Sequence, residues 1–198
     1  MTRPVVYFCG PHGAGKSTAI NRLVTHRGLA RGFAVSFPVP EDSAYQRASV
    51  RAIKYLVEQI ENEKKPQSAM LLADRCIYDT LCYINAYQDL GWITADEARR
   101  LIAHIDCLFL PHGFPGVLVC MLPDLPLLRE RLRCRAVEGD LRWQHDNPAL
   151  LQAVHTQYEK LFTRLSATDK RILRLRNESA DQQLEDLLDF IQPFQDYG

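Results

Sequence analysis

The 198-residue sequence lacks the features that would place it in a membrane or on nucleic acid. No apolar run approaches the about 20 residues that a membrane-spanning helix needs. We expect no signal peptide, because the first four residues lead directly into an apolar strand pattern. Lys and Arg together number 24, as do Asp and Glu, so a broad basic surface is absent. We therefore expect a cytoplasmic protein with no membrane partner and no nucleic-acid partner.

Cysteine and histidine are present but lack the spacing of a structural site. No two of the six cysteines form a C-x-x-C pair, and the six histidines show no metal-ligand spacing. This pattern predicts reduced thiols in a cytosolic protein, not disulfides or a zinc site. The sequence also lacks internal repeats and low-complexity tracts, and its length suits one domain. We expect a single domain that spans residues 1–198.

One short stretch, residues 10–18, carries a specific motif, Gly-Pro-His-Gly-Ala-Gly-Lys-Ser-Thr. It fits the phosphate-binding loop pattern of Gly, four residues and then Gly-Lys-Ser/Thr, between an apolar strand pattern and a helical one. Glycines let the loop turn its N–H groups around a phosphate, and the new helix adds its positive end. The sequence therefore predicts that ATP binds here with Mg²⁺, which Ser17 would ligate while Lys16 reaches the β- and γ-phosphates. The expected nucleotide-binding residues are Gly10, His12, Gly13, Ala14, Gly15, Lys16, Ser17 and Thr18.

Strand and helix patterns alternate along the chain, which is typical of a parallel sheet covered by helices on both faces. We expect five strands, at about residues 4–9, 33–37, 68–73, 117–122 and 171–176. We expect helices at about residues 16–29, 43–64, 77–90, 94–108, 124–137, 147–166 and 180–191. The predicted fold class is α/β, a three-layer domain with a five-stranded parallel sheet. Residues that follow its strands meet at one edge and form the binding site.

Charged residues after the second and third expected strands are candidates for catalysis. The Glu41 carboxylate can accept the proton of an attacking hydroxyl, while Asp42 or Ser43 caps the next helix. Asp74 can hold Mg²⁺ at the end of the third strand, and Arg75 can neutralise a phosphate. The alternative for Asp74 and Arg75 is a surface ion pair at the start of a helix.

Four arginines, at positions 129, 131, 133 and 135, fall in the helix expected after the fourth strand. Arg131 and Arg135 share one helix face because they are four residues apart. We expect this pair to neutralise a transferring phosphoryl group, and we expect Arg129 to lie on the surface. The Gly-containing segment that follows is typical of a flexible lid, expected over about residues 131–146. The alternative is an exposed basic helix that pairs with Glu130 and Glu138.

These motifs resemble those of P-loop nucleoside and nucleotide kinases, in particular the thymidylate kinase and deoxynucleoside kinase families. Residues 10–23 resemble the opening of thymidylate kinases, Asp74-Arg75 resembles their Asp-Arg pair, and residues 130–135 are similar to their lid entry. Residues 149–159 resemble the helix after the lid of deoxynucleoside kinases, and residues 74–83 resemble small kinases related to nicotinamide riboside kinases. The resemblance implies a phosphotransferase that uses ATP and Mg²⁺ on a nucleoside or nucleotide.

The chain also departs from these families after the second expected strand. Thymidylate kinases carry an arginine there that grips the acceptor's phosphate, whereas this chain has Pro40-Glu41-Asp42 and no arginine before Arg47. Glu41 resembles the glutamate base of deoxynucleoside kinases, which favours a hydroxyl acceptor. A kinase of a non-nucleoside acceptor and a P-loop ATPase switch stay open as alternatives, as does a homodimeric assembly.

Overall fold

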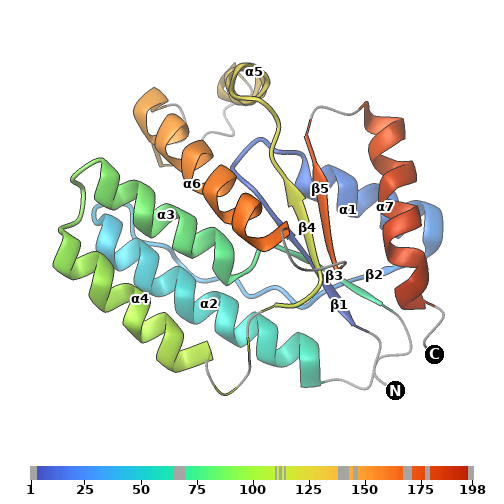
Figure 1. Ribbon diagram of the computed structural model, residues 1–198, viewed down its shortest axis with the longest axis horizontal. Coiled ribbons are helices and arrows are strands. Elements are labelled where there is room, and N and C mark those ends of the chain that lie inside the picture. The colour runs from blue at the N-terminus through green and yellow to red at the C-terminus, as the bar shows by residue number, and fades with distance from the viewer. Residues whose placement is uncertain are drawn as a thin grey trace.

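The computed structural model describes residues 4–64, 70–109, 111, 113, 115–137, 143–144, 147–166, 171–176 and 179–195. Over these ranges, a five-stranded, all-parallel sheet lies between two layers of helices (Figure 1). The strands are β1 (Val5–Cys9), β2 (Ala30–Arg31), β3 (Leu71–Asp74), β4 (Leu118–Met121) and β5 (Ile172–Leu175), in the order β2-β3-β1-β4-β5. The fold class predicted from the sequence is confirmed.

Seven helices occupy the described ranges. They are α1 (Lys16–Arg27), α2 (Ala44–Lys64), α3 (Ile77–Asp89), α4 (Ala95–Phe109), α5 (Leu125–Val137), α6 (Pro148–Ser166) and α7 (Ala180–Gln195). Each lies close to its predicted range. None of these helices has both the length and the apolar character that crossing a bilayer requires.

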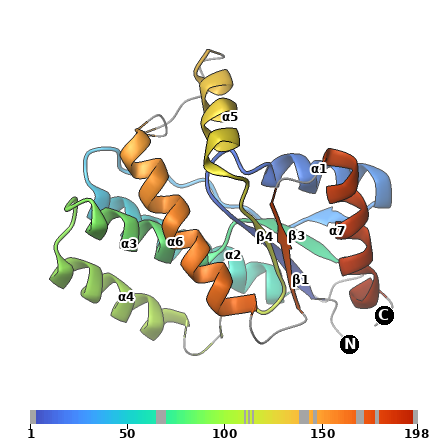
Figure 2. The same ribbon diagram turned by 45° about the horizontal axis from the view of Figure 1, so that its top comes forward.

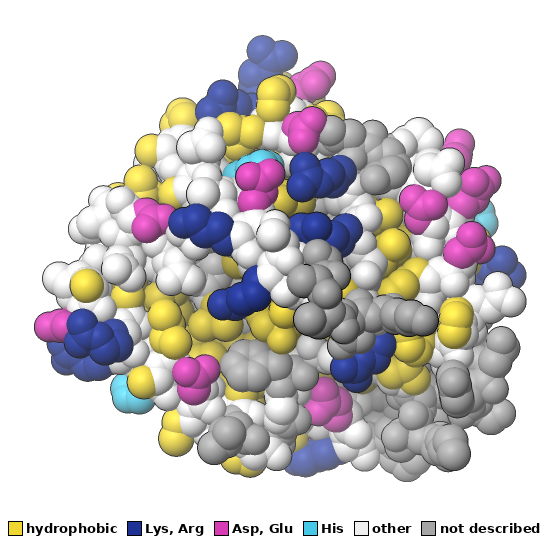
Figure 3. Space-filling view, in the orientation of Figure 1, with side chains coloured by type: hydrophobic (Ala, Val, Ile, Leu, Met, Phe, Trp, Pro, Cys, Tyr) yellow, Lys and Arg dark blue, Asp and Glu magenta, His cyan; other side chains and the backbone are white. Residues whose placement is uncertain are grey.

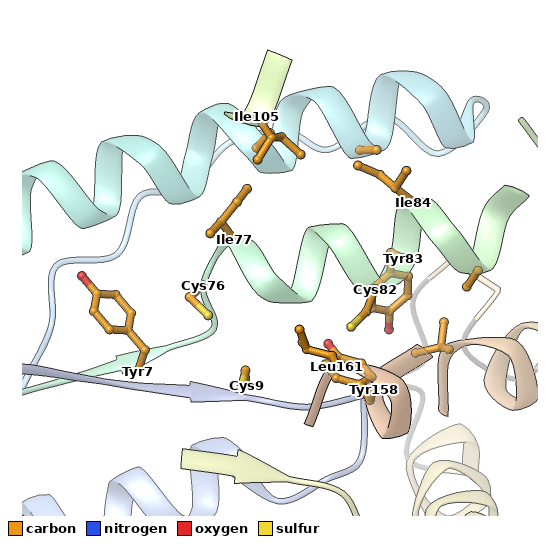
Figure 4. Packing of buried hydrophobic residues seen from close by; sticks show 14 of the residues in the cluster. Tyr7, Cys9, Cys76, Ile77, Cys82, Tyr83, Ile84, Ile105, Tyr158 and Leu161 are labelled. Carbon is orange, nitrogen blue, oxygen red and sulfur yellow. The ribbon is translucent and has the colours of Figure 1, made fainter. Parts of the chain in front are cut away.

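The central strand β1 explains the two layers, because its side chains alternate between the faces of the sheet. Val5, Tyr7 and Cys9 pack into a core with buried residues of α2, α3, α4 and α6. Val6 and Phe8 point the other way, into a core with α1, α5 and α7. A strand buried on both faces is apolar throughout, as this one is. Figure 4 shows Tyr7 and Cys9 on the strand facing the α3 side of the domain.

The second strand differs from its prediction. The sequence pattern favours residues 33–37, but β2 covers only Ala30–Arg31, and residues 33–37 form no strand. After Gly32, whose N–H still bonds Leu72, the backbone finds partners on α2 instead of the sheet. Asn62 bonds both the N–H and the carbonyl of Phe33, and the Glu58 carboxylate accepts the N–H of Val35. These side chains satisfy the backbone that a longer strand would have paired.

Two helix starts follow the capping rules. At α2 the Ser43 hydroxyl, not Asp42, accepts the N–H of Gln46. At α4 Thr94 and Glu97 form the predicted capping box, with the Glu97 carboxylate accepting the N–H of Thr94 and the Thr94 hydroxyl accepting that of Glu97. These caps fix where the chain enters the two helices of the outer α2–α4 layer.

Candidate active site

The phosphate-binding motif forms the turn between β1 and α1, at the carboxyl end of the central strand. Gly10, Gly13 and Gly15 all have positive φ, at 150°, 79° and 97°. A Cβ at position 10 would fall 2.1 Å from the backbone oxygen of Met121, so only glycine fits there. The glycine pattern read from the sequence therefore has a steric cause as well as a conformational one.

Lys16 is the first residue of α1, and its side chain is only 5% exposed. Its ammonium donates to the carbonyl oxygens of Gly10 and Pro11, at 2.7 and 2.9 Å. Burial and, to a lesser extent, the nearby Arg75 guanidinium lower the pKa of this ammonium to about 8. An anion bound in the loop would restore the charge, so Lys16 is arranged to respond to a phosphate.

Ser17 and Asp74 meet beside the loop although they are 57 positions apart in sequence. The Ser17 hydroxyl donates to Oδ2 of Asp74 at 2.5 Å, while Oδ1 of Asp74 is buried and has no hydrogen-bond partner among the described residues. β3 places this carboxylate next to β1, with Phe8 opposite Asp74 in the register. One hydroxyl and one carboxylate with an unsatisfied oxygen fit Mg²⁺, which completes its shell with water and substrate phosphates. No group of three His, Cys, Asp or Glu in the described ranges could hold a metal alone.

Arg75 adopts a φ of 86°, which is unusual for a residue with a side chain. Its N–H donates to the carbonyl of Phe8 at 2.8 Å, which fixes this conformation. Its guanidinium lies 3.0 Å from Nδ1 of His12, and the His12 ring meets the edge of Tyr83. Strain of this kind costs about 1–3 kcal/mol and clusters at functional sites. The Arg75 guanidinium therefore contacts the phosphate-binding loop through the His12 side chain.

Asp79, on the first turn of α3, is a buried hub that the sequence patterns do not single out. Its Oδ1 accepts the N–H of Gly10 at 3.1 Å and the hydroxyl of Tyr158 at 2.5 Å, and its Oδ2 accepts the N–H of Cys76 at 2.9 Å. Arg75 lies 4.0 Å away. The sequence signal for Asp79 is a capping box at the start of α3. It is easy to overlook because the N-cap residue of this box is Cys76 and not Ser or Thr. Figure 4 shows Tyr158 and Cys76 on the same side of α3.

A cleft of about 460 Å³, here called the α7 cleft, opens on one side of the loop. Gly13, Gly15 and Thr18 form one wall, and residues of α5 and α7 form the others, including Arg131, Arg135 and Leu184. The base of α5 packs on the loop, because Leu128 and Leu132 lie against Gly13. Figure 2 shows α5 projecting beyond the rest of the domain above this region.

A second cleft of about 600 Å³, here called the α2 cleft, opens on the other side of the loop. Its walls come from His12, from the segment 34–41 and from α2. Its charged lining residues are Glu41, Arg47, Arg51, Lys54, Arg75 and Arg135. The expected base Glu41 therefore lies in this cleft with Arg75, and the Glu41 carbonyl accepts the indole N–H of Trp143.

The two α5 arginines predicted to act together do share one side of the helix. Arg131 donates to the carbonyls of Gly13 and Ala14, at 3.2 and 3.4 Å. Arg135 lines both the α7 cleft and the α2 cleft. Arg129 is exposed, as expected. The lid tip at 138–142 lies outside the described residues, as do residues 145 and 146.

Sequence reasoning missed three cations on α2. Arg47, Arg51 and Lys54 line the α2 cleft and recur at intervals of four and three residues, which places them on one helix face. That periodicity was visible in the sequence, but nothing indicated which face of α2 would meet the loop. Packing decides this, since the adjoining stripe of α2 carries Ala48 and Ala52 into the core.

No protein-family model matches the sequence, and no curated protein does either. Solved structures do match. A deoxyadenosine kinase from M. mycoides with bound dATP is 14% identical at a TM-score of 0.75, covering 94% of this chain and 98% of that chain. The thymidylate kinase from Candida albicans is 15% identical at a TM-score of 0.64, and the match covers 100% of this chain and 94% of that chain. The NadR protein in complex with NR is 11% identical at a TM-score of 0.64, covering 98% of this chain and 52% of that one. With its loop, sheet order and these likenesses, the chain has the P-loop kinase fold.

Proposed function

We propose that this protein is an ATP-dependent kinase that transfers the γ-phosphate of ATP to a nucleoside or nucleotide. One observation carries the proposal: the phosphate-binding loop lies between two clefts, and Arg135 lines both of them. A transferase needs a place for each of two substrates, with the transferred group between them. An ATPase switch needs a binding place for ATP alone. The neighbours of similar fold include a deoxyadenosine kinase and a thymidylate kinase, which agrees with this acceptor class.

The α7 cleft is the side from which the donor enters, because Gly13, Gly15 and Thr18 line it. The loop N–H groups and Lys16 would hold the donor phosphates. Ser17 and Asp74 would hold Mg²⁺, which supplies charge neutralisation at the β- and γ-phosphates. The loop residues Gly10, His12 and Ala14 shape the cradle between β1 and α1.

Transfer breaks the bond between the γ-phosphorus and the oxygen that bridges it to the β-phosphate, and forms a bond to the acceptor oxygen. Where that oxygen belongs to a hydroxyl, its proton passes to the Glu41 carboxylate in the α2 cleft. Arg75 and Arg131 offset the charge at the phosphoryl group, and Arg135 reaches it from the helix above. We also propose that α5 and the segment after it form a lid, which excludes water and so limits hydrolysis of ATP.

The test incubates the purified full chain with ATP, Mg²⁺ and a panel of nucleosides, nucleotides and other hydroxyl metabolites, with products identified by mass spectrometry. A phosphorylated acceptor, and ATP turnover that rises strongly in its presence, is the expected result. The matched control is Lys16→Met, which keeps an unbranched side chain but removes the ammonium. Hydrolysis that no acceptor stimulates would favour the switch ATPase, and an unaffected Lys16→Met variant would refute the loop assignment.

A further inference from the structure

The α2 cleft concentrates positive charge in a protein whose formal net charge is zero. Over the face in Figure 3, Lys and Arg side chains alternate with Asp and Glu, in keeping with a net charge of zero. The α2 cleft differs, since five of the described residues that line it are cationic and one, Glu41, carries a carboxylate. A cleft lined by one sign of charge attracts ligands of the opposite sign.

The two α2 arginines of this cleft have no carboxylate within ion-pair distance in the ranges that the structure describes. Arg47 is 5% exposed, donates to the carbonyl of Pro40 at 3.0 Å and lies 4.4 Å from the centre of the Trp143 ring. Arg51 lies 5.2 Å from the centre of the Tyr83 ring. Burial lowers the pKa of Arg47, with the charge of Arg51 adding to the effect. Aromatic faces orient these guanidinium groups but leave their charge unbalanced.

Lys54 is the next cation along the same face, one turn beyond Arg51. It lies 3.7 Å from Glu58, whose carboxylate also accepts the N–H of Val35. Glu58 is therefore shared between Lys54 and the backbone, so it offsets the charge of Lys54 only in part and leaves the arginines unmatched. Guanidinium groups prefer the planar, two-oxygen edge of a carboxylate or phosphate.

The donor does not supply this missing anion. Arg47, Arg51 and Lys54 line the α2 cleft and not the α7 cleft, whereas Gly13 and Gly15 of the loop line the α7 cleft. The donor phosphates have their own partners in the loop N–H groups and Lys16. A second anionic group is needed on the acceptor side.

We propose that the acceptor is an anion whose phosphate or carboxylate group is held by Arg51 and Lys54, while its receiving oxygen faces Arg75 and Arg135. This inference rests on the proposed function. A hydroxyl can still be the receiving group, so Glu41 as base and an anionic anchor are compatible in one acceptor.

The test measures binding by calorimetry, with the donor site filled by Mg²⁺ and the non-hydrolysable analogue AMP-PNP. Probes are inorganic phosphate, four nucleosides each beside its 5′-monophosphate, and glycerate beside glycerol. We expect the charged member of at least one pair to bind about tenfold tighter than its neutral partner. Preference for the monophosphates identifies the anchor as a phosphate, and preference for glycerate identifies it as a carboxylate.

Variants then locate the anchor. Arg51→Gln and Lys54→Gln should each remove most of this preference, and Arg51→Lys should restore much of it by keeping the charge. Arg129→Gln, on the exposed side of α5, is the matched loss of one positive charge and should change nothing. The proposal is overturned if no probe shows charge-dependent binding at up to about 10 mM, or if Arg51→Gln weakens neutral and charged probes alike. Charge-dependent binding without transfer to any acceptor would refute the kinase function while leaving this site intact.

Discussion

The hydroxyl of Ser17 lies 2.5 Å from a carboxylate oxygen of Asp74, and the other oxygen of that carboxylate is buried with no hydrogen-bond partner in the part of the chain that the structure describes. We expect Asp74→Asn to weaken Mg²⁺ binding, because an amide oxygen carries no charge and its NH₂ group is a donor. The Mg²⁺ concentration for half-maximal turnover should rise at least about tenfold, with a smaller change in the affinity for metal-free ATP.

A matched control for this variant is Asp42→Asn, which neutralises an exposed carboxylate that does not cap α2. Its dependence on Mg²⁺ should equal that of the unmodified protein. Equal Mg²⁺ requirements in Asp74→Asn and Asp42→Asn would show that Asp74 does not serve the metal.

The lowered pKa of Lys16 predicts how nucleotide binding depends on pH. Burial brings the pKa of the free ammonium to about 8, and only the protonated form attracts phosphate. Affinity for ATP should therefore be constant near pH 7 and fall above pH 8, by up to about tenfold per pH unit. Binding above pH 8 should also take up protons, because the bound phosphates favour the charged form. Calorimetry in two buffers of different ionisation enthalpy measures this uptake.

The control for the pH profile is Lys16→Met, which has no group to titrate. Its weaker binding should show no fall between pH 8 and 9.5. A fall of the same steepness in both proteins would assign the titration to another group.

Arg135 should matter far more than the other arginines of α5 because it alone in this helix lines both clefts, so far as the described residues go. We expect Arg135→Ala to lower kcat by about 1,000-fold or more, which is usual for an arginine that meets a transferring phosphoryl group. Arg129→Ala removes the same charge from the exposed side of the same helix and should stay within about twofold. Similar losses in both variants would mean that the helix acts through its net charge alone.

The sequence allowed the sheet, the helices and the loop to be predicted because their signals are local. Residues 5–9 are apolar and directly precede the glycine motif, and Ser43 and Thr94 mark helix starts with side chains that cap the backbone. The order of elements then brings Asp74 to Ser17, because β3 and β1 are neighbours with parallel ends.

The features that the sequence did not predict depend mainly on contacts between distant residues. The second strand ends early because Asn62 and Glu58 of α2 bind the backbone after Gly32. No pattern near residue 33 indicates these partners, which lie 29 and 23 positions along the chain from the residues they bind. The cations of α2 are similar, since only packing determines which helix face meets the loop. Asp79 was hidden because three partners of its carboxylate come from residues 10, 76 and 158.

The Asp79 hub gives a further prediction, which distinguishes an effect on the stability of the fold from an effect on nucleotide binding by the loop. Both oxygens of this buried carboxylate accept a backbone N–H, so an asparagine must turn its NH₂ group toward one of these donors. Asp79→Asn should lower the free energy of unfolding by about 3 kcal/mol or more, as expected when a buried charge network loses its anion. Tyr158→Phe removes only one hydrogen bond to Oδ1 and should cost about 1–2 kcal/mol.

Because Asp79 also holds the N–H of Gly10, the two variants should differ in nucleotide affinity and not only in stability. Asp79→Asn displaces the first glycine of the loop, so ATP should bind at least about tenfold more weakly. Tyr158→Phe leaves the bond to Gly10 in place, so binding should stay within about twofold. Urea unfolding measures the effect on stability, and calorimetry at a temperature where the unfolding curves show both variants to be folded measures the effect on affinity. If affinity falls in step with stability in both variants, Asp79 acts on the core alone and does not position the loop.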